Sequence, residues 1–186
     1  MTLISQVETI FGKIERGWSF QCGAHPYKVV ECLGGRLEGI ATYCTVGVSR
    51  AVLKFERRRE ISHEILISLD AGFIPTNVVA LVRQVSDQVL DSHLPLKNNE
   101  IIRRSGPIFL GKNFTAFWVK SPIFFGDDAE AYESDGVGGG LCIFVWLVPI
   151  FESEAKFIEL YGGEAFEDLL VERDVDYFSL ERPAVV

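Results

Sequence analysis

Apolar side chains recur at helical spacing in several parts of the chain. Residues 2–16 carry them three and four positions apart, behind Thr2, a residue type that caps helix N-termini well. A second stripe begins behind Pro75, which suits the first turn of a helix, and runs to about Asp91. Near the C-terminus, two short stripes are separated by the glycines 162–163. These patterns predict amphipathic helices, each with one face that must pack on another element.

Strand signals fill the chain between these helices. Residues 27–33 and 37–46 flank a pair of glycines and predict a hairpin. Residues 107–110 and 114–120 flank a Gly-Lys-Asn turn and predict a second hairpin. Residues 141–148 are consecutive apolar residues with no polar face, so this strand should be central and covered on both sides.

The order of the predicted elements indicates the fold class. A helix, several strands, a second helix, further strands and two final helices do not follow the regular alternation of parallel α/β sheets. We therefore predict an α+β fold with a mixed or largely antiparallel sheet, a central strand at 141–148 and helices packed on the sheet. No linker or internal repeat divides the sequence, so we expect one domain over residues 1–186, with residues 1–24 as an N-terminal helix and lead-in.

Composition narrows the class of protein. Of the 186 residues, 48% are hydrophobic and 24% are charged, which is typical of a globular domain and excludes a fibrous or disordered chain. The 18 Lys and Arg against 26 Asp and Glu give a net charge of -8, which disfavours nucleic acid as a ligand. The sequence shows neither a signal peptide nor the roughly 20 apolar residues that span a bilayer, so we expect a cytoplasmic protein without a membrane segment. Its four cysteines are too few and too scattered for a disulfide framework.

Residues with catalytic or metal-binding chemistry form no complete site along the sequence. His63 and Glu64 begin like a zinc-protease motif, but Ile67 stands where the second histidine belongs. Cys22 and His25 have the spacing of metal ligands, yet no second close pair completes a tetrahedral site. We therefore predict no catalytic residue, no metal and no cofactor. A small metal-dependent hydrolase built around Cys22 and His25 is kept as an alternative.

An acidic run near residue 130 is the densest charge cluster of the chain. It lacks the alternating ligands of an EF-hand, so it is either a solvated loop or a contact site for a basic partner, since charge of one sign attracts the opposite sign. The predicted partner-binding residues are its five carboxylates, Asp127, Asp128, Glu130, Glu133 and Asp135.

Several segments, taken in order, resemble the suppressor-of-fused domain family. Residues 45–49 are similar to its Thr-Tyr-Gly-Leu-Ser signature, with Val46 in place of the aromatic residue, and residues 64–69 are similar to its Glu-Leu-Thr strand. Residues 147–150, followed by an acid, look like its Leu-Val-Pro-Ile junction, and an Arg-Pro pair at 182–183 completes the pattern. Six family-motif positions are expected to have structural roles: Thr45, Gly47, Ser49, Glu64, Pro149 and Glu154.

The resemblance implies a function as well as a fold. It implies an α+β domain without a catalytic centre or cofactor that works by binding another protein. Short relatives in bacteria have been linked to toxin–immunity loci, so the implied partner is a basic toxin or an extended peptide. We therefore expect a non-catalytic, intracellular protein-binding module, with an immunity protein as its specific form. The alternatives are the hydrolase and a structural subunit of a homo-oligomer; the sequence leaves the oligomeric state open.

Overall fold

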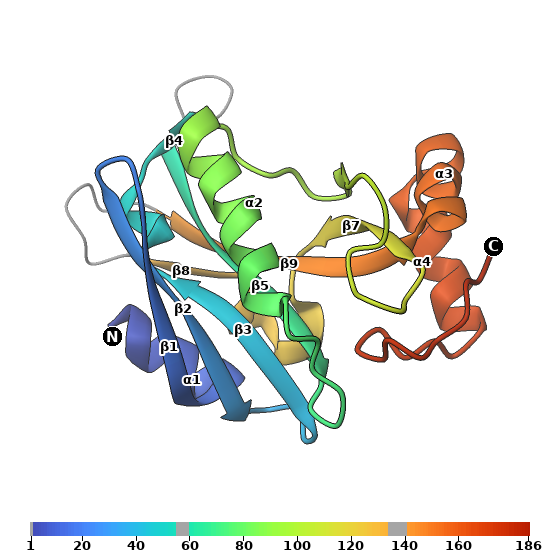
Figure 1. Cartoon of the computed structure of the whole chain (residues 1–186), viewed down its shortest axis with the longest axis horizontal. Coiled ribbons are helices and arrows are strands. Elements are labelled where there is room, and N and C mark those ends of the chain that lie inside the picture. The colour runs from blue at the N-terminus through green and yellow to red at the C-terminus, as the bar shows by residue number, and fades with distance from the viewer. Residues whose placement is uncertain (1, 55–59, 134–140) are drawn as a thin grey trace.

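The computed structural model describes residues 2–54, 60–133 and 141–186 (Figure 1). Its helices are α1 (Leu3–Phe11), α2 (Val78–Ser92), α3 (Glu152–Tyr161) and α4 (Gly163–Glu172), with short 3-10 helices at Val48–Arg50, Ile123–Phe125 and Asp127–Ala129. Its strands are β1 (Gly12–Cys22), β2 (His25–Gly34), β3 (Ile40–Val46), β4 (Leu53–Lys54), β5 (Glu60–Asp70), β6 (Ile101–Arg103), β7 (Phe114–Lys120), β8 (Ala131–Glu133) and β9 (Leu141–Phe151).

The strands form one mixed sheet, which confirms the predicted α+β class. Its order is β1-β2-β3-β5-β9-β7-β6, with β4 paired to β5 and β8 paired to β9. The β5–β9 pair is parallel and the other pairs are antiparallel. The predicted hairpin of β2 and β3 is present, as is the middle helix, which spans Val78–Ser92.

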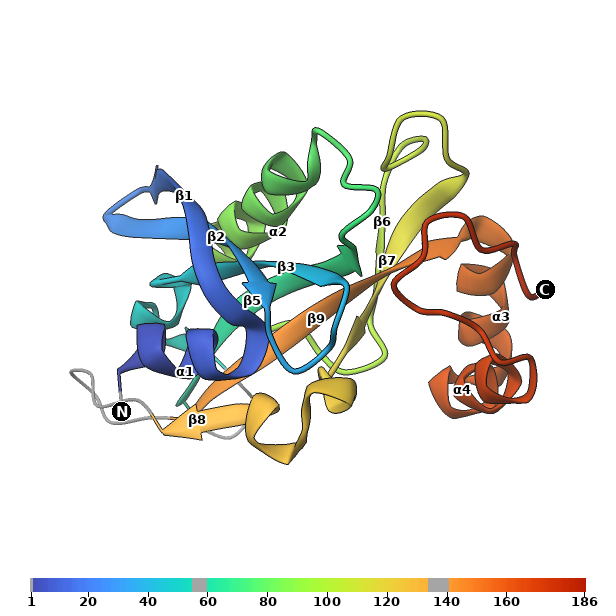
Figure 2. The ribbon, with the colours of Figure 1, turned by 90° about the horizontal axis from the view of Figure 1, so that it is seen from below.

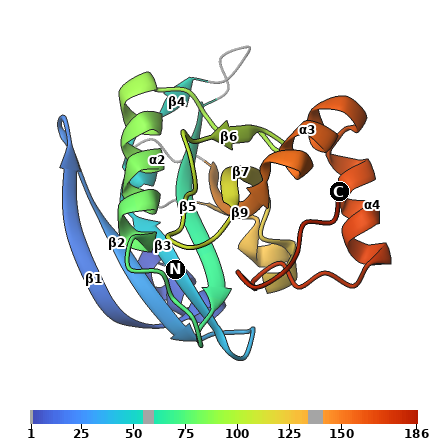
Figure 3. The same cartoon turned by 45° about the vertical axis from the view of Figure 1, so that its right-hand side comes forward.

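Helices cover both faces of the sheet, as Figures 2 and 3 show. One apolar cluster joins α2 to one face, and the other cluster joins α1, α3 and α4 to the opposite face. The central strand β9 supplies Val145 and Leu147 to the first cluster and Phe144 and Trp146 to the second. Its unbroken apolar sequence is therefore explained, because side chains that alternate along a strand are buried on both faces. No helix of the described residues is long and apolar enough to cross a membrane.

The N-terminal prediction of one helix over residues 2–16 is wrong. Thr2 caps α1 as expected, but the helix ends at Phe11 and the chain continues as β1, an edge strand of the sheet. Gly12 makes this switch at φ 99°, and a Cβ at this position would lie 2.1 Å from the carbonyl oxygen of Leu33. The apolar residue Ile14 fits the helical spacing but is paired with β2, a tertiary contact that spacing does not reveal. The segment 1–24 thus contributes a strand as well as a helix.

The prediction of a hairpin between residues 107–110 and 114–120 is also wrong. β7 pairs with β6 and β9, while residues 107–110 form a loop. The apolar residues Ile108 and Phe109 are buried in the cluster under α2, so burial and not strand pairing explains them. The Ile108 amide donates a hydrogen bond of 2.8 Å to the Phe114 carbonyl, so the two predicted strands do meet at this point.

Candidate functional site

Four of the six family-motif residues meet in a buried hydrogen-bond cluster around Glu64. The Glu64 carboxylate lies on β5 and accepts bonds from the Thr45 hydroxyl at 2.5 Å and the Gly47 amide at 2.8 Å. Ser49 donates both its hydroxyl, at 2.6 Å, and its amide, at 3.1 Å. The Thr45 hydroxyl also accepts the Ile65 amide at 2.8 Å, just beyond the last paired residues of β3 and β5. The motif therefore ties the end of β3 to β5.

The geometry explains why these residue types occur at this spacing. Gly47 has φ 111°, a left-handed conformation that disfavours other residues, and it turns the chain so that its own amide and that of Ser49 point to one carboxylate. Glu64 is fully buried, and the donors that its carboxylate accepts are hydroxyl and amide groups. Burial raises the pKa of Glu64 because the donors offset the cost of desolvating the charge only in part.

The other two motif residues belong to a second buried cluster, at the C-terminal end of β9. Glu154 is fully buried and forms a bidentate ion pair with Arg182, with nitrogen–oxygen distances of 2.7 and 2.8 Å. The same carboxylate accepts the amides of Phe151 and Val185, at 2.9 and 3.1 Å. Arg182 also donates to the carbonyl oxygen of Pro149 at 3.0 Å. This cluster holds the C-terminal segment against β9 and α3.

The acidic run has more structure than a loop. Asp127 begins a 3-10 helix and its side chain is exposed, and the side chain of Glu130 is exposed as well. The next residues form β8, which pairs with β9, and the Glu130 carbonyl accepts the Phe144 amide at 3.0 Å. The structure describes only the backbone of Asp128 and Glu133, and Asp135 lies outside the described residues. The exposed carboxylates thus directly precede a short strand whose second edge pairs with no other described strand.

Folding brings acids and a histidine close to Cys22 and His25. The Cys22 thiol lies 3.1 Å from a carboxylate oxygen of Asp91, and the ring of His93 lies 6.4 Å from that of His25. Burial and the adjacent Asp91 raise the pKa of Cys22 to about 11, so the thiol stays protonated and is a poor nucleophile or ligand. Among the described residues, no group of three or more His, Cys, Asp or Glu side chains is placed to hold a metal ion.

His63 was noted in the sequence only as part of an incomplete zinc-protease motif, and the structure shows it in a buried site. It lies on β5 and is only 1% exposed. Desolvation lowers its pKa from 6.5 to about 4, against the opposing effect of nearby main-chain groups. None of those groups meets the geometry of a hydrogen bond to the ring, so both ring nitrogens lack a partner among the described residues. His63 is therefore neutral near pH 7.

We expect His63 to make the protein less stable in mild acid. Between pH 6.5 and about 4 the unfolded chain binds a proton at His63 and the folded chain does not, so the stabilising contribution is lost as the pH falls through this window. The shift corresponds to about 3 kcal/mol. Urea unfolding at pH 7 and 4.5 should show a larger loss for the natural chain than for His63→Leu. Parallel losses in the two proteins would contradict this assignment.

Comparisons with known proteins agree with this architecture. The family model for Suppressor of fused protein (SUFU) matches residues 23–183. A crystal structure of a SUFU homologue from Neisseria gonorrhoeae FA 1090 aligns with a TM-score of 0.74 and 15% identity, covering 98% of this chain and 93% of that chain. A chain of the Sufu–Fu complex crystal structure aligns with a TM-score of 0.69 and 11% identity, covering 98% and 90%. No match was found among curated proteins.

A longer relative has the same fold over part of its length. The crystal structure of Drosophila Suppressor of Fused aligns with a TM-score of 0.59 and 12% identity, over 91% of this chain but 42% of that one. At identities this low, structural likeness establishes the fold alone. The family assignment rests on the sequence match, which extends from the turn after β1 to the Arg-Pro pair at 182–183. The buried Glu64 and Glu154 clusters lie within that match. On this basis the chain belongs to the suppressor of fused family.

Proposed function

We propose that this protein is a non-catalytic protein-binding module that occludes a basic partner. The observation that carries the proposal is that the buried acids of the family motifs are bonded to other parts of this protein. Glu64 and Glu154 spend their hydrogen-bonding capacity on the protein's own backbone and side chains, so these motifs stabilise the fold instead of acting on a substrate. We therefore expect the partner to bind at residues on the surface of the protein. A chain of this fold in the Sufu–Fu complex supports a protein as the partner.

The surface that best fits a basic partner lies around β8. Asp127 and Glu130 are exposed beside a strand edge that is unpaired among the described strands. An extended peptide can add to such an edge through main-chain hydrogen bonds, while carboxylates beside it favour Lys and Arg in that peptide. The net charge of -8 also attracts a basic partner, at longer range than these contacts. A basic toxin neutralised by this contact is the specific form of the proposal.

Charge reversal tests this surface. We expect Asp127→Lys combined with Glu130→Lys to weaken binding to a basic partner by at least about tenfold at low salt, because two attractive contacts become repulsive. The partner is first captured from native lysate at low and at raised salt, and its affinity for each purified variant is then measured by calorimetry.

The matched control is Asp168→Lys combined with Glu172→Lys, which makes the same change in net charge on the exposed side of α4, far from β8 (Figure 1). If both double variants lose affinity equally, only the net charge matters and the β8 surface is not the contact. If neither loses affinity, the electrostatic proposal fails. For a captured toxin, co-expression with each variant measures neutralisation directly.

A further inference from the structure

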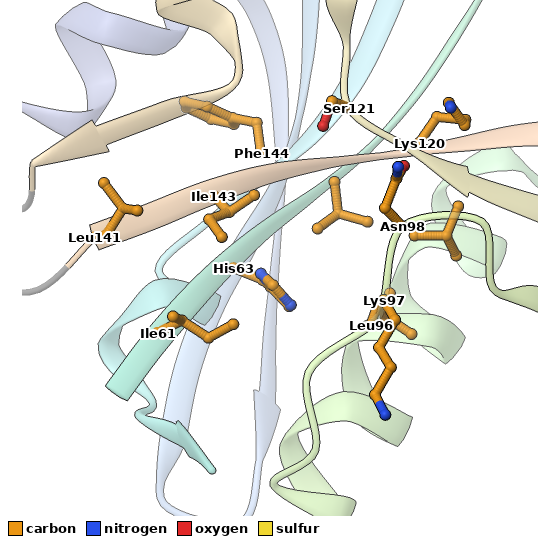
Figure 4. Close-up of a pocket in the computed structure, with 12 residues that line it drawn as sticks. Ile61, His63, Leu96, Lys97, Asn98, Lys120, Ser121, Leu141, Ile143 and Phe144 are labelled. Carbon is orange, nitrogen blue, oxygen red and sulfur yellow. The ribbon is translucent and has the colours of Figure 1, made fainter. Parts of the chain in front are cut away.

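A pocket opens at the amino ends of the parallel strands β5 and β9. It has a volume of about 460 Å³, in the range of sites that bind small molecules. Ile61 of β5 and Ile143 of β9 line its floor, and Leu96, on the connection between α2 and β6, lies opposite (Figure 4). Polar side chains of the lining, among them Asn98 and Ser121, lie mainly toward one side of this space.

His63 projects from β5 into this pocket, between Ile143 and Leu96 (Figure 4). Its two ring nitrogens are buried without a hydrogen-bond partner among the described residues. An unpaired polar group of this kind costs stability, and a buried polar atom in a native protein usually has a partner. Since the ring faces a cavity, the missing partner can come from a bound group.

The chemistry of the walls restricts what that group can be. A neutral imidazole has a donor at one nitrogen and an acceptor at the other, and a hydroxyl, which both donates and accepts, can bond to either of them. The charge of Lys120 at the polar side is already matched, since its ammonium group forms an ion pair with Glu167 and lies 3.4 Å from the side-chain oxygen of Asn99. An uncharged head group on an apolar body can bond to the neutral ring without bringing a further charge into this largely apolar space.

We propose that the pocket binds an uncharged, largely apolar group that ends in a hydroxyl, such as a phenol, with His63 bonded to the hydroxyl. Binding requires the Leu96 side chain to move aside, because it faces the ring and the nitrogens are covered in the free protein. Leu96 is partly exposed on an irregular connection, where such a movement is least costly. The phenol can be a free molecule or the tyrosine side chain of a partner protein.

A matched pair of probes tests the hydrogen bond. Titrations of the full chain with p-cresol and with toluene, followed by NMR at pH 7, compare two molecules of similar shape that differ by one hydroxyl. We expect p-cresol to bind at least about tenfold more tightly, because a buried site built for a hydroxyl rejects the analogue that lacks it. His63→Leu should bind toluene at least as well as the natural chain and should lose the preference for p-cresol.

Other results overturn the proposal. These are equal binding of the two probes to the natural chain, no binding of either, or a preference that persists in His63→Leu. Leu96→Ala serves as a second variant, and we expect it to bind p-cresol more tightly because it uncovers the ring. If Leu96→Ala leaves p-cresol affinity unchanged, the assigned position of the ligand is wrong.

Two further titrations separate the sources of the phenol and keep this inference apart from the surface around β8. A capped Gly-Tyr-Gly peptide and its Phe counterpart show whether a tyrosine of a partner protein can enter; if only p-cresol binds, the ligand is a free molecule. The variant with Asp127→Lys and Glu130→Lys should bind p-cresol like the natural chain. Failure of the charge-reversal test therefore leaves the pocket intact, and failure of the p-cresol test leaves the acidic surface intact.

Discussion

Replacing Arg182 with methionine is expected to lower the free energy of unfolding by about 3–5 kcal/mol, because it leaves the Glu154 carboxylate buried without its counter-charge. Glu154 is fully buried and both of its oxygens contact the guanidinium group. Arg182 also lies over the rings of Phe114 and Phe151, at 5.2 and 5.1 Å, so its loss removes packing as well as charge. Urea unfolding at pH 7, monitored by circular dichroism, measures the effect.

Two companion variants show whether the unpaired charge is the cause. Arg182→Lys keeps a positive charge but not the planar fork that fits the carboxylate, so its loss should be intermediate. Combining Glu154→Leu with Arg182→Met removes both charges, and this double variant should be more stable than Arg182→Met alone. Losses that simply add in the double variant would show that the ion pair does not act as a unit.

Replacing Glu64 with alanine is expected to destabilise the protein by at least about 3 kcal/mol, because it leaves several buried donors without an acceptor and opens a cavity. Those donors come from Thr45, Gly47 and Ser49. Ser49→Ala is the matched control: it removes one hydroxyl donor and keeps the backbone bond to Glu64, so it should cost about 1 kcal/mol. If Glu64→Ala lowered the free energy of unfolding no more than Ser49→Ala does, the other hydrogen bonds of the cluster would contribute little to stability.

The contribution of Glu64 to stability changes with pH in the opposite direction to that of His63. Burial raises the pKa of Glu64 from its ordinary value of 4.5, so above this pH the unfolded chain releases a proton that the folded chain still holds. The contribution of Glu64 to stability is therefore greatest at low pH and falls as the pH rises. Relative to Glu64→Gln, which does not titrate, the natural chain should lose stability between pH 4.5 and 7. A constant difference between the two would rule out a raised pKa.

The fold class was predictable because its main signals are local. The apolar run at 141–148 is typical of a strand buried on both faces, and β9 is that strand. The helical spacing after Pro75 and the paired glycines between residues 33 and 37 likewise mark α2 and the β2–β3 hairpin. Where the prediction failed, at Gly12 and at residues 107–110, the deciding contact came from a distant segment: Leu33 for Gly12, and α2 with the residue before it for residues 107–110.

The motif positions were predictable as a set, but their arrangement was not. Thr45, Gly47 and Ser49 were identified by resemblance, 15 to 19 residues before Glu64, and nothing in that spacing shows that the three converge on one carboxylate. His63 was noted only as part of an incomplete zinc motif. Its pocket is lined in part by Leu96, which the chain reaches only after α2, so the sequence gives no sign of it.

The sequence by itself determined the α+β class, the central strand and the acidic character, since each depends on composition or on short-range periodicity. It also gave the family-motif positions, through resemblance to the suppressor-of-fused family. Only the tertiary structure decided that the motif acids are buried, that Asp127 and Glu130 lie next to a strand edge, and that His63 faces a cavity. The physical reason is that burial and hydrogen bonding depend on which distant segments meet. In the Glu154–Arg182 pair, 28 residues separate two charges that stabilise the fold only when they are in contact.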